Sequence, residues 1–273
     1  MSSNPFPYKA ICSDLDLTLL HSDASISQPA VQLLNRALAR GIKVCLVSAR
    51  HPLGITLYQP YFNQPLPYVA YNGGLAVTEE GRELYNYTIP APKARQIWEA
   101  ALASGIPGTM MVYAQANWYA QAADKENPYL LKEENYMGLQ PILADFKELF
   151  QAGLQPNKFL FSSDPSASLA IEKVLLEHAG QLHVCRSSQW SVDVMPHGID
   201  KALGVKAMAR HWGLRLEEIL AFGDSANDLE MLRSVGWGVA VANAAPEVAA
   251  AANDHTLSNN QDGVARYLER WEL

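Results

Sequence analysis

The chain has 273 residues, of which 49% are hydrophobic and 18% charged. These proportions are typical of a folded globular protein and exclude a disordered or fibrous chain. Asp and Glu outnumber Lys and Arg by 28 to 21, which gives a formal charge of -7. Because binding to a phosphate backbone requires a basic excess, nucleic acid is not expected as a partner. The length suits one large domain or two modest ones.

The cysteines and the first residues indicate the compartment. Cys12, Cys45 and Cys185 are scattered and form no CxxC pair, which argues against a disulfide framework and against a zinc site. The chain reaches Asp14 before an apolar signal region could form. No later stretch contains the roughly 18 consecutive apolar residues of a membrane span. We therefore expect a cytoplasmic protein without a membrane partner.

The first 82 residues alternate strands and one clear helix. Ser27 is a suitable N-cap and Gly41 a suitable end for an amphipathic helix. The turn signal Asn72-Gly73-Gly74 ends the last apolar run of this part. The predicted elements are a strand at 8–13, a helix at 27–40, and strands at 42–47 and 67–71.

The pattern of predicted strands and helices changes after residue 82, and the earlier pattern returns at residue 197. The middle part reads as strands at 109–113, 158–162, 182–186 and 191–195 with helices at 91–104, 142–152 and 166–179. The last part reads as helices at 201–211, from 227, at 246–252 and from 262, with strands at 219–222 and 238–241. We predict an α/β fold with a doubly wound parallel sheet, in which a core of 1–82 and 197–273 is interrupted by an inserted α+β domain over 83–196.

Polar residues follow the predicted strands, at the edge where an open parallel sheet binds its ligands. They are Asp14 to Thr18, Ser48 to Arg50, Asn72, and Gly223 to Asp228. Taken singly, such residues are common in turns and helix caps. Together they crowd four carboxylates, and like charges about 4 Å apart repel by roughly 4 kcal/mol at an effective dielectric of 20. An all-oxygen set predicts Mg²⁺, since the histidines offer no zinc spacing.

These residues resemble the four motifs of a known superfamily. The set Asp14-x-Asp16-x-Thr18, Ser48, Lys201 and Gly223-Asp224-x-x-Asn227-Asp228 is similar to the motifs of the haloacid dehalogenase (HAD) superfamily. The phrases Ser48-Ala49-Arg50, Asn72-Gly73-Gly74 and Met231-Leu232, with Gly236 and Gly238 after them, resemble its Cof-type sugar-phosphatase branch. That branch carries a cap domain inserted after the third core strand. The predicted pattern of strands and helices changes at the same place in this sequence.

The resemblance implies a Mg²⁺-dependent phosphatase for a small phosphorylated metabolite, either a sugar phosphate or a phosphorylated cofactor. Asp14 would be the nucleophile that forms an aspartyl-phosphate, and Asp16 the general acid and then base. Asp14, Asp224 and the backbone carbonyl of Asp16 would hold the metal. The phosphoryl group would be bound by Ser48, Lys201, Asn227 and the backbone amides near Leu15 and Ala49. Asp228 and Thr18 would support the metal site from behind.

Two residues depart from the family pattern. Leu17 and Ala49 stand where the family usually has glycine. If the first loop needs a positive φ, leucine costs roughly 1–2 kcal/mol of strain. The methyl group of Ala49 could restrict the approach of phosphate.

Two other functions remain open on the same fold. A phosphotransferase or phosphomutase would pass the phosphoryl group to a second substrate. A non-catalytic phospholigand sensor is disfavoured by the intact pair Asp14 and Asp16. A dinucleotide-binding oxidoreductase is weaker still, because the first strand meets no GxGxxG.

The insertion should supply substrate specificity. Its Tyr113, Trp118, Tyr119 and Trp190 either stack on a ligand or belong to a core. Lys158 and Asp193 are equally open between a binding and a structural role.

Overall fold

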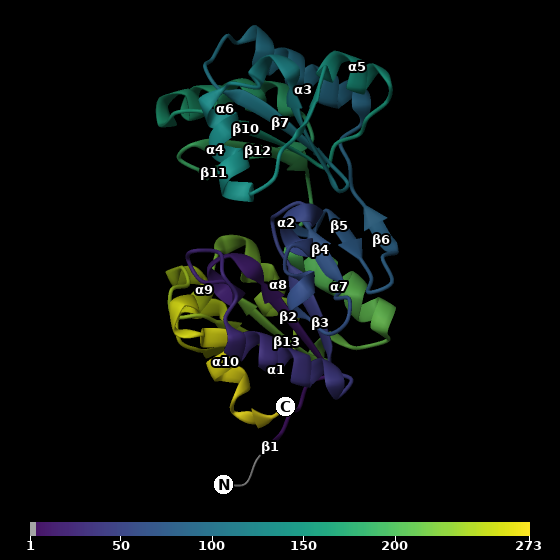
Figure 1. Ribbon diagram of the computed structural model, residues 1–273, viewed down its shortest axis with the longest axis vertical. Helices are drawn as coiled ribbons and strands as arrows, with labels where there is room; N and C mark the ends of the chain where they lie inside the picture. The colour runs from purple at the N-terminus through teal and green to yellow at the C-terminus, as the bar shows by residue number, and fades with distance from the viewer. Residues whose placement is uncertain (1–3) are drawn as a thin grey trace. The chain divides into compact units, whose positions relative to one another are not determined.

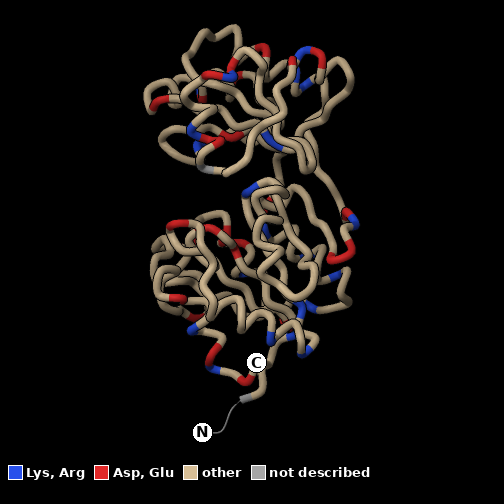
Figure 2. The backbone as a smooth tube through the Cα atoms, viewed as in Figure 1, with Lys and Arg blue, Asp and Glu red and all other residues tan. Residues whose placement is uncertain are grey.

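The computed structural model describes residues 4–273, which divide into two compact units (Figure 1). The first unit contains the chain up to Arg50 together with Ile55–Tyr85 and Ile199–Leu273. The second contains His51–Gly54 and Asn86–Gly198. Figure 2 shows that charged residues of both signs occur in both units. Within the described residues, none of the helices combines the length and apolar character that a membrane crossing demands.

An eight-stranded sheet forms the centre of the first unit. Six neighbouring strands are parallel and the seventh, β5, is antiparallel to β4. In spatial order the strands are β15 (Asp254–His255), β14 (Trp237–Ala240), β13 (Ile219–Gly223), β2 (Ala10–Asp14), β3 (Lys43–Val47), β4 (Tyr68–Ala70), β5 (Leu75–Val77) and β6 (Glu83–Asn86). A separate parallel pair joins β1 (Asn4–Pro5) to β16 (Trp271–Glu272). The predicted α/β class is confirmed.

Helices cover both faces of this sheet, so its central strands are buried on both sides. On one face, α7 (Lys201–Trp212), α8 (Leu229–Ser234) and α9 (Pro246–Ala251) pack on side chains that include Cys12 and Cys45. On the other lie α1 (Gln28–Ala39) and α10 (Gly263–Leu268), where the ring of Tyr267 meets Phe222 edge-on with centroids 5.5 Å apart. Continuous apolar runs such as residues 219–222 are the sequence signature of this arrangement.

The helix α1 shows how local signals set an element. The hydroxyl of Ser27 accepts a hydrogen bond from the amide of Ala30 at 3.3 Å, and a proline lies in the first turn, as an N-cap requires. Val31, Leu34 and Leu38 are buried at helical spacing. The predicted helix over 27–40 is confirmed, with bounds one residue shorter at each end.

The second unit is built on a six-stranded sheet. The helices α3 (Ala91–Ala103), α5 (Phe146–Gln151) and α6 (Pro165–Ala179) share an apolar cluster with the sheet. In spatial order the strands are β11 (Leu182–Ser188), β12 (Ser191–Pro196), β10 (Lys158–Ser162), β7 (Thr109–Ala114), β8 (Asn117–Gln121) and β9 (Ile142–Ala144). The remaining helices are α4 (Pro128–Met137) and the short α2 (Pro52–Thr56).

One predicted helix is wrong in its first part. Residues 142–152 were expected to be helical, but Ile142–Ala144 is β9, which pairs in parallel with β8. The helix begins only after Asp145, whose carboxylate accepts from the amide of Lys147 at 2.8 Å. A strand partner distant in sequence thus overrides the helical pattern. The strand β8 and the helix α4 were not predicted, and the helix expected from residue 227 begins at Leu229.

We expect Gly204→Ala to destabilise the protein by about 1–3 kcal/mol, because there is no room for a side chain between α7 and β4. A Cβ at Gly204 would overlap both methyl groups of Val69. Gly213→Asn at the end of the same helix is the control, since this position has a φ of +68° and open space around it and asparagine tolerates that conformation. Urea denaturation measures both variants. Equal losses would contradict the close packing.

Candidate active site

The strand register places the predicted site residues at one edge of the first sheet. Asp14 ends β2 opposite Val47 of β3, so Ser48 follows beside it. On the other side of β2, Ser13 is opposite Phe222 of β13, and Asp224 comes two residues later. The carboxyl ends of three adjacent strands therefore supply one set of polar groups, all of them within the first unit.

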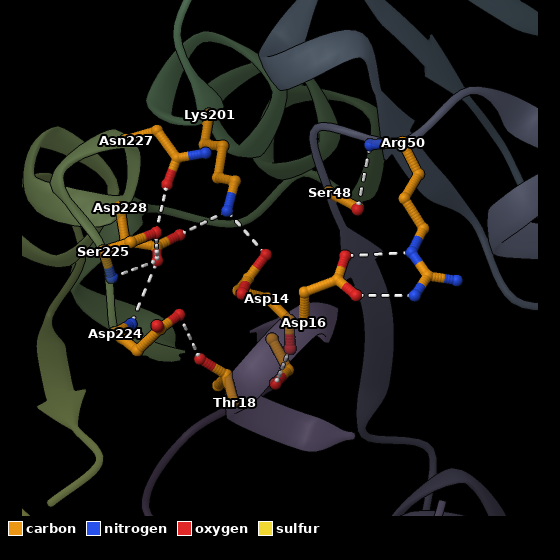
Figure 3. A network of polar contacts seen from close by, with 11 residues as sticks. Asp14, Asp16, Thr18, Ser48, Arg50, Lys201, Asp224, Ser225, Asn227 and Asp228 are labelled. Atoms are coloured by element: carbon orange, nitrogen blue, oxygen red, sulfur yellow. Dashed lines mark hydrogen bonds and ion pairs between the residues drawn. The ribbon is translucent and has the colours of Figure 1, made fainter. Parts of the chain in front are cut away.

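A buried lysine links two of the carboxylates (Figure 3). Nζ of Lys201 lies 2.5 Å from Oδ1 of Asp14 and 2.6 Å from Oδ1 of Asp228. Lys201 is the first residue of α7, and a cation is disfavoured at this positive end of a helix. The two carboxylates offset that effect and the loss of hydration, because an ammonium this deeply buried must be paired.

The pKa values reflect this crowding. Burial raises the pKa of Asp14 well above its usual range, Lys201 lowers it, and Asp228 and Asp224 raise it further. Burial and Asp228 likewise raise the pKa of Asp224. Burial alone would lower the pKa of Lys201, but its two carboxylate partners outweigh it and raise the value. The single ammonium of Lys201 cannot neutralise all three carboxylates. A further cation would relieve the repulsion that remains between them.

The acidic residues could hold such a cation. Carboxylate oxygens of Asp14, Asp224 and Asp228 lie within 4.8 Å of one another. Oδ2 of Asp228 accepts hydrogen bonds from the amides of Asp224 and Ser225, at 3.0 and 3.1 Å. Thr18 donates to Oδ1 of Asp224 at 3.0 Å. Hard cations such as Mg²⁺ prefer oxygen donors of this kind.

Asp16 is turned toward Arg50 (Figure 3). Nε and one terminal nitrogen of Arg50 donate to its two carboxylate oxygens at 2.9 and 2.5 Å. Arg50 also donates to the hydroxyl of Tyr58 at 3.3 Å. Ser48-Ala49-Arg50 was recognisable as a motif in the sequence, but no role was predicted for Arg50. The sequence signal that pointed to Arg50 was its position two residues after Ser48, a predicted phosphate-binding residue. The pairing of Arg50 with Asp16 depends on side-chain geometry, which the sequence does not give.

The turn that contains Asp16 is strained at Leu17. The sequence predicted this strain only on the condition that the loop needs a positive φ. Leu17 in the turn Leu15–Leu19 has a φ of 58° and is 46% exposed. Its carbonyl accepts a hydrogen bond from Nδ2 of Asn243 at 2.8 Å. Leucine thus occupies a left-handed conformation that usually favours glycine.

The other predicted residues lie around the same edge. Ser48 is fully buried and its hydroxyl accepts from the amide of Arg50 at 3.1 Å. Oδ1 of Asn227 accepts from the hydroxyl of Ser225 at 2.7 Å. Leu15 is buried and Ala49 is partly exposed. The ten predicted residues thus all belong to the first unit, and their chemical roles stay predictions.

A parallel α/β sheet with buried aspartates at the end of its central strand is the arrangement of a hydrolase family. A model of the haloacid dehalogenase-like hydrolases matches residues 11–268. The chain belongs to this family, and the membership predicted from its motifs is confirmed.

Individual relatives span nearly the whole chain. A Haemophilus influenzae protein, whose name describes it provisionally as a phosphatase, is 33% identical over 262 residues, covering 96% of this chain and 97% of that protein. An HMP-PP phosphatase of Escherichia coli is 28% identical over 265 residues, 94% and 93% of the two chains. The crystal structure of a haloacid dehalogenase-like hydrolase from Bacteroides thetaiotaomicron superimposes with a TM-score of 0.87 at 31% identity, covering 96% of this chain and 99% of that one.

Lys201→Met should lower the free energy of unfolding by about 3–5 kcal/mol in metal-free buffer, because it leaves buried carboxylates without their cation. In an Asp14→Asn background the same substitution should cost less, since one of those charges is already removed. Urea denaturation of the two single variants and the double variant measures this coupling. Strictly additive losses would mean that the 2.5 Å contact contributes nothing.

Mg²⁺ should raise the melting temperature more at pH 8 than at pH 5. The raised pKa values of Asp14 and Asp224 mean that the native state binds protons more tightly than the unfolded chain, so without metal its stability falls as pH rises. Mg²⁺ binds the ionised form and offsets this loss. Thermal unfolding with Mg²⁺ or with EDTA measures the shift, and Asp224→Asn should abolish most of it. An equal shift at both pH values, or in the variant, would contradict the assignment.

Proposed function

We propose that this hydrolase is a Mg²⁺-dependent phosphatase, a phosphoric monoester hydrolase that acts on a small phosphorylated metabolite through an aspartyl-phosphate. The observation that carries the proposal is the carboxylate of Asp14, buried at the end of β2 and 2.5 Å from Nζ of Lys201. A nucleophile in this position is oriented by a fixed cation and lies next to further carboxylates. The name of the Escherichia coli relative, HMP-PP phosphatase, supports the same reaction class.

The chemistry divides into two displacements at phosphorus. In the first, an oxygen of Asp14 forms a bond to phosphorus, the ester bond breaks, and Asp16 gives a proton to the leaving oxygen. In the second, water attacks the phosphorus, Asp16 takes a proton from it, and the bond to Asp14 breaks to release inorganic phosphate. Together, the two steps return both aspartates to their starting states.

The surrounding residues bind and orient the phosphoryl group. We assign this role to Lys201, Ser48, Asn227 and the backbone amides near Leu15 and Ala49, whose donors would stabilise charge as it moves. Asp14, Asp224 and the carbonyl of Asp16 would hold Mg²⁺, with Asp228 and Thr18 behind them. When bound, the ion would lessen the repulsion between the anionic nucleophile and the anionic ester.

Arg50 positions Asp16 before the reaction. Both carboxylate oxygens of Asp16 are paired with this guanidinium, so the carboxyl must leave it to reach the leaving oxygen. Tyr58 holds Arg50, and its own hydroxyl donates to the carbonyl of Ala24 at 2.9 Å. We expect Arg50 to keep Asp16 ordered without substrate.

The proposal also assigns roles to the two units. The first is the catalytic core, since it contains every residue named for the chemistry. The second, close to the predicted insertion of 83–196, is the cap that recognises the organic part of the substrate. We place the reaction in the cytoplasm, because scattered unpaired cysteines suit a reducing compartment.

Asp14→Asn should reduce release of inorganic phosphate from p-nitrophenyl phosphate by about a thousandfold or more, because an amide cannot replace the nucleophile. EDTA should abolish release by the parent protein, and added Mg²⁺ should restore it. Asp23→Asn, in an exposed turn, serves as the matched control and should keep full activity. The proposal is wrong if folded Asp14→Asn protein retains turnover, or if the parent protein releases phosphate at the same rate with and without EDTA.

A further inference from the structure

The loop at residues 241–245, which follows β14, contacts both acidic loops of the candidate site. The amide of Ala245 donates to the carbonyl of Asp224 at 2.8 Å. Nδ2 of Asn243 donates to the carbonyl of Leu17 at 2.8 Å. This loop therefore joins the turn after β2 to the loop after β13, and all of these residues belong to the first unit.

The side chain of Asn243 is held at both of its polar atoms. Its Oδ1 accepts a hydrogen bond from the amide of Asn259 at 2.9 Å, while its Nδ2 donates to Leu17. Asn259 is buried, and its own Nδ2 donates to the carbonyl of Leu20 at 3.0 Å. Because one partner of Asn243 is an amide donor and the other a carbonyl acceptor, only one orientation of its amide group satisfies both. Two linked asparagines thus hold the turn Leu15–Leu19 and the residue after it.

The bond from Asn243 falls on the strained residue of this turn. Leu17 has a φ of 58°, a conformation that disfavours leucine because its Cβ crowds the following carbonyl oxygen. One intramolecular hydrogen bond stabilises a protein by about as much as such strain destabilises it. The bond from Asn243 is therefore strong enough to decide whether Leu17 stays in the left-handed conformation.

The conformation of Leu17 sets the direction of Asp16, the residue before it. The following residue, Thr18, is anchored, since its hydroxyl donates to Oδ1 of Asp224 at 3.0 Å (Figure 3). A return of Leu17 to an ordinary helical φ would rotate the preceding peptide by about 120° relative to Thr18. The carbonyl of Asp16, a proposed metal ligand, would then change its direction relative to Asp224.

We propose that Asn243 is a positioning residue: by holding the carbonyl of Leu17, it keeps this leucine left-handed and so fixes the direction of Asp16. The inference rests on the proposed phosphatase function, in which Asp16 transfers a proton and supplies a metal ligand. It also gives a physical reason why leucine can stand where the family usually has glycine. Glycine adopts a positive φ without strain and would not need this bond.

Turnover of p-nitrophenyl phosphate at saturating Mg²⁺ tests the coupling between the two residues. Asn243→Ala should lower kcat at least tenfold and change KM less than threefold, because the proposed nucleophile and phosphoryl-binding residues are untouched. Leu17→Gly should stay within a few fold of the parent protein. In the Leu17→Gly background, Asn243→Ala should lower kcat less than threefold, because glycine leaves no strain to offset.

Asn260→Ala is the matched control. Asn260 is an exposed asparagine that makes two hydrogen bonds of 2.9 Å with Ser22, outside the turn that contains Asp16, so its loss should leave kcat within twofold. An equal loss from Asn243→Ala with leucine or glycine at position 17 would overturn the inference, because a general structural role does not depend on strain there. Urea denaturation checks folding. If Asn243→Ala alone fails to fold, folding of the double variant is the expected rescue, and failure of both overturns the inference.

A second measurement does not depend on turnover. Isothermal titration calorimetry of the substrate-free protein measures the affinity for Mg²⁺, which Asn243→Ala should weaken at least fivefold and Leu17→Gly should restore in the double variant. Loss and recovery of affinity in a protein that releases no phosphate would keep this inference and reject the phosphatase. Mg²⁺-dependent release by the parent, with affinity and kcat unchanged in Asn243→Ala, would reject the inference and keep the phosphatase. A parent that neither binds Mg²⁺ nor releases phosphate would reject both.

Discussion

The ammonium of Lys201 lies between carboxylates that the chain supplies from two distant segments, Asp14 at the end of the first long strand and Asp228 beyond β13. Without this cation the buried acidic groups would repel one another in a region with little water to screen them. The amides of Asp224 and Ser225 hold the far oxygen of Asp228, so the charge balance also orders the loop after β13. The same contacts that hold this sheet edge thus also orient Asp14, the proposed nucleophile.

Elements with local signals were predicted well. The helix α1 follows from the Ser27 cap and from apolar residues at helical spacing, both of which lie within its own sequence. The parallel strands of the first unit follow from apolar runs that end in polar residues. Residues 142–144 were assigned to the wrong element because their structure depends on pairing with β8. That strand was itself not predicted, so the sequence pattern offered no competitor to the helix.

Some contacts of the candidate site were likewise predicted from the sequence and others were not. The prediction that Asp14 and Asp224 would meet followed from parallel strands ending at one edge of their sheet. The place of Lys201 beside Asp14 was expected only from the resemblance to the HAD motifs. The pairing of Asp16 with Arg50 could not be predicted, since it depends on how two side chains turn within adjacent loops. The positive φ of Leu17 was raised only as a condition. The spacing of the motif does not show whether the leucine at this position adopts the left-handed conformation that glycine adopts easily.

The return of the chain from the second unit is fixed at Gly73. A side chain at Gly73 would overlap the carbonyl of Asp200, so glycine permits this close approach. Asp200 also caps α7 by accepting from the amide of Leu203 at 2.7 Å, and Lys201 follows directly. The position of the lysine is therefore set by contacts within the first unit, whatever lies between residues 86 and 198. A second unit of different length or sequence would therefore leave the lysine in place, as long as these contacts within the first unit were kept.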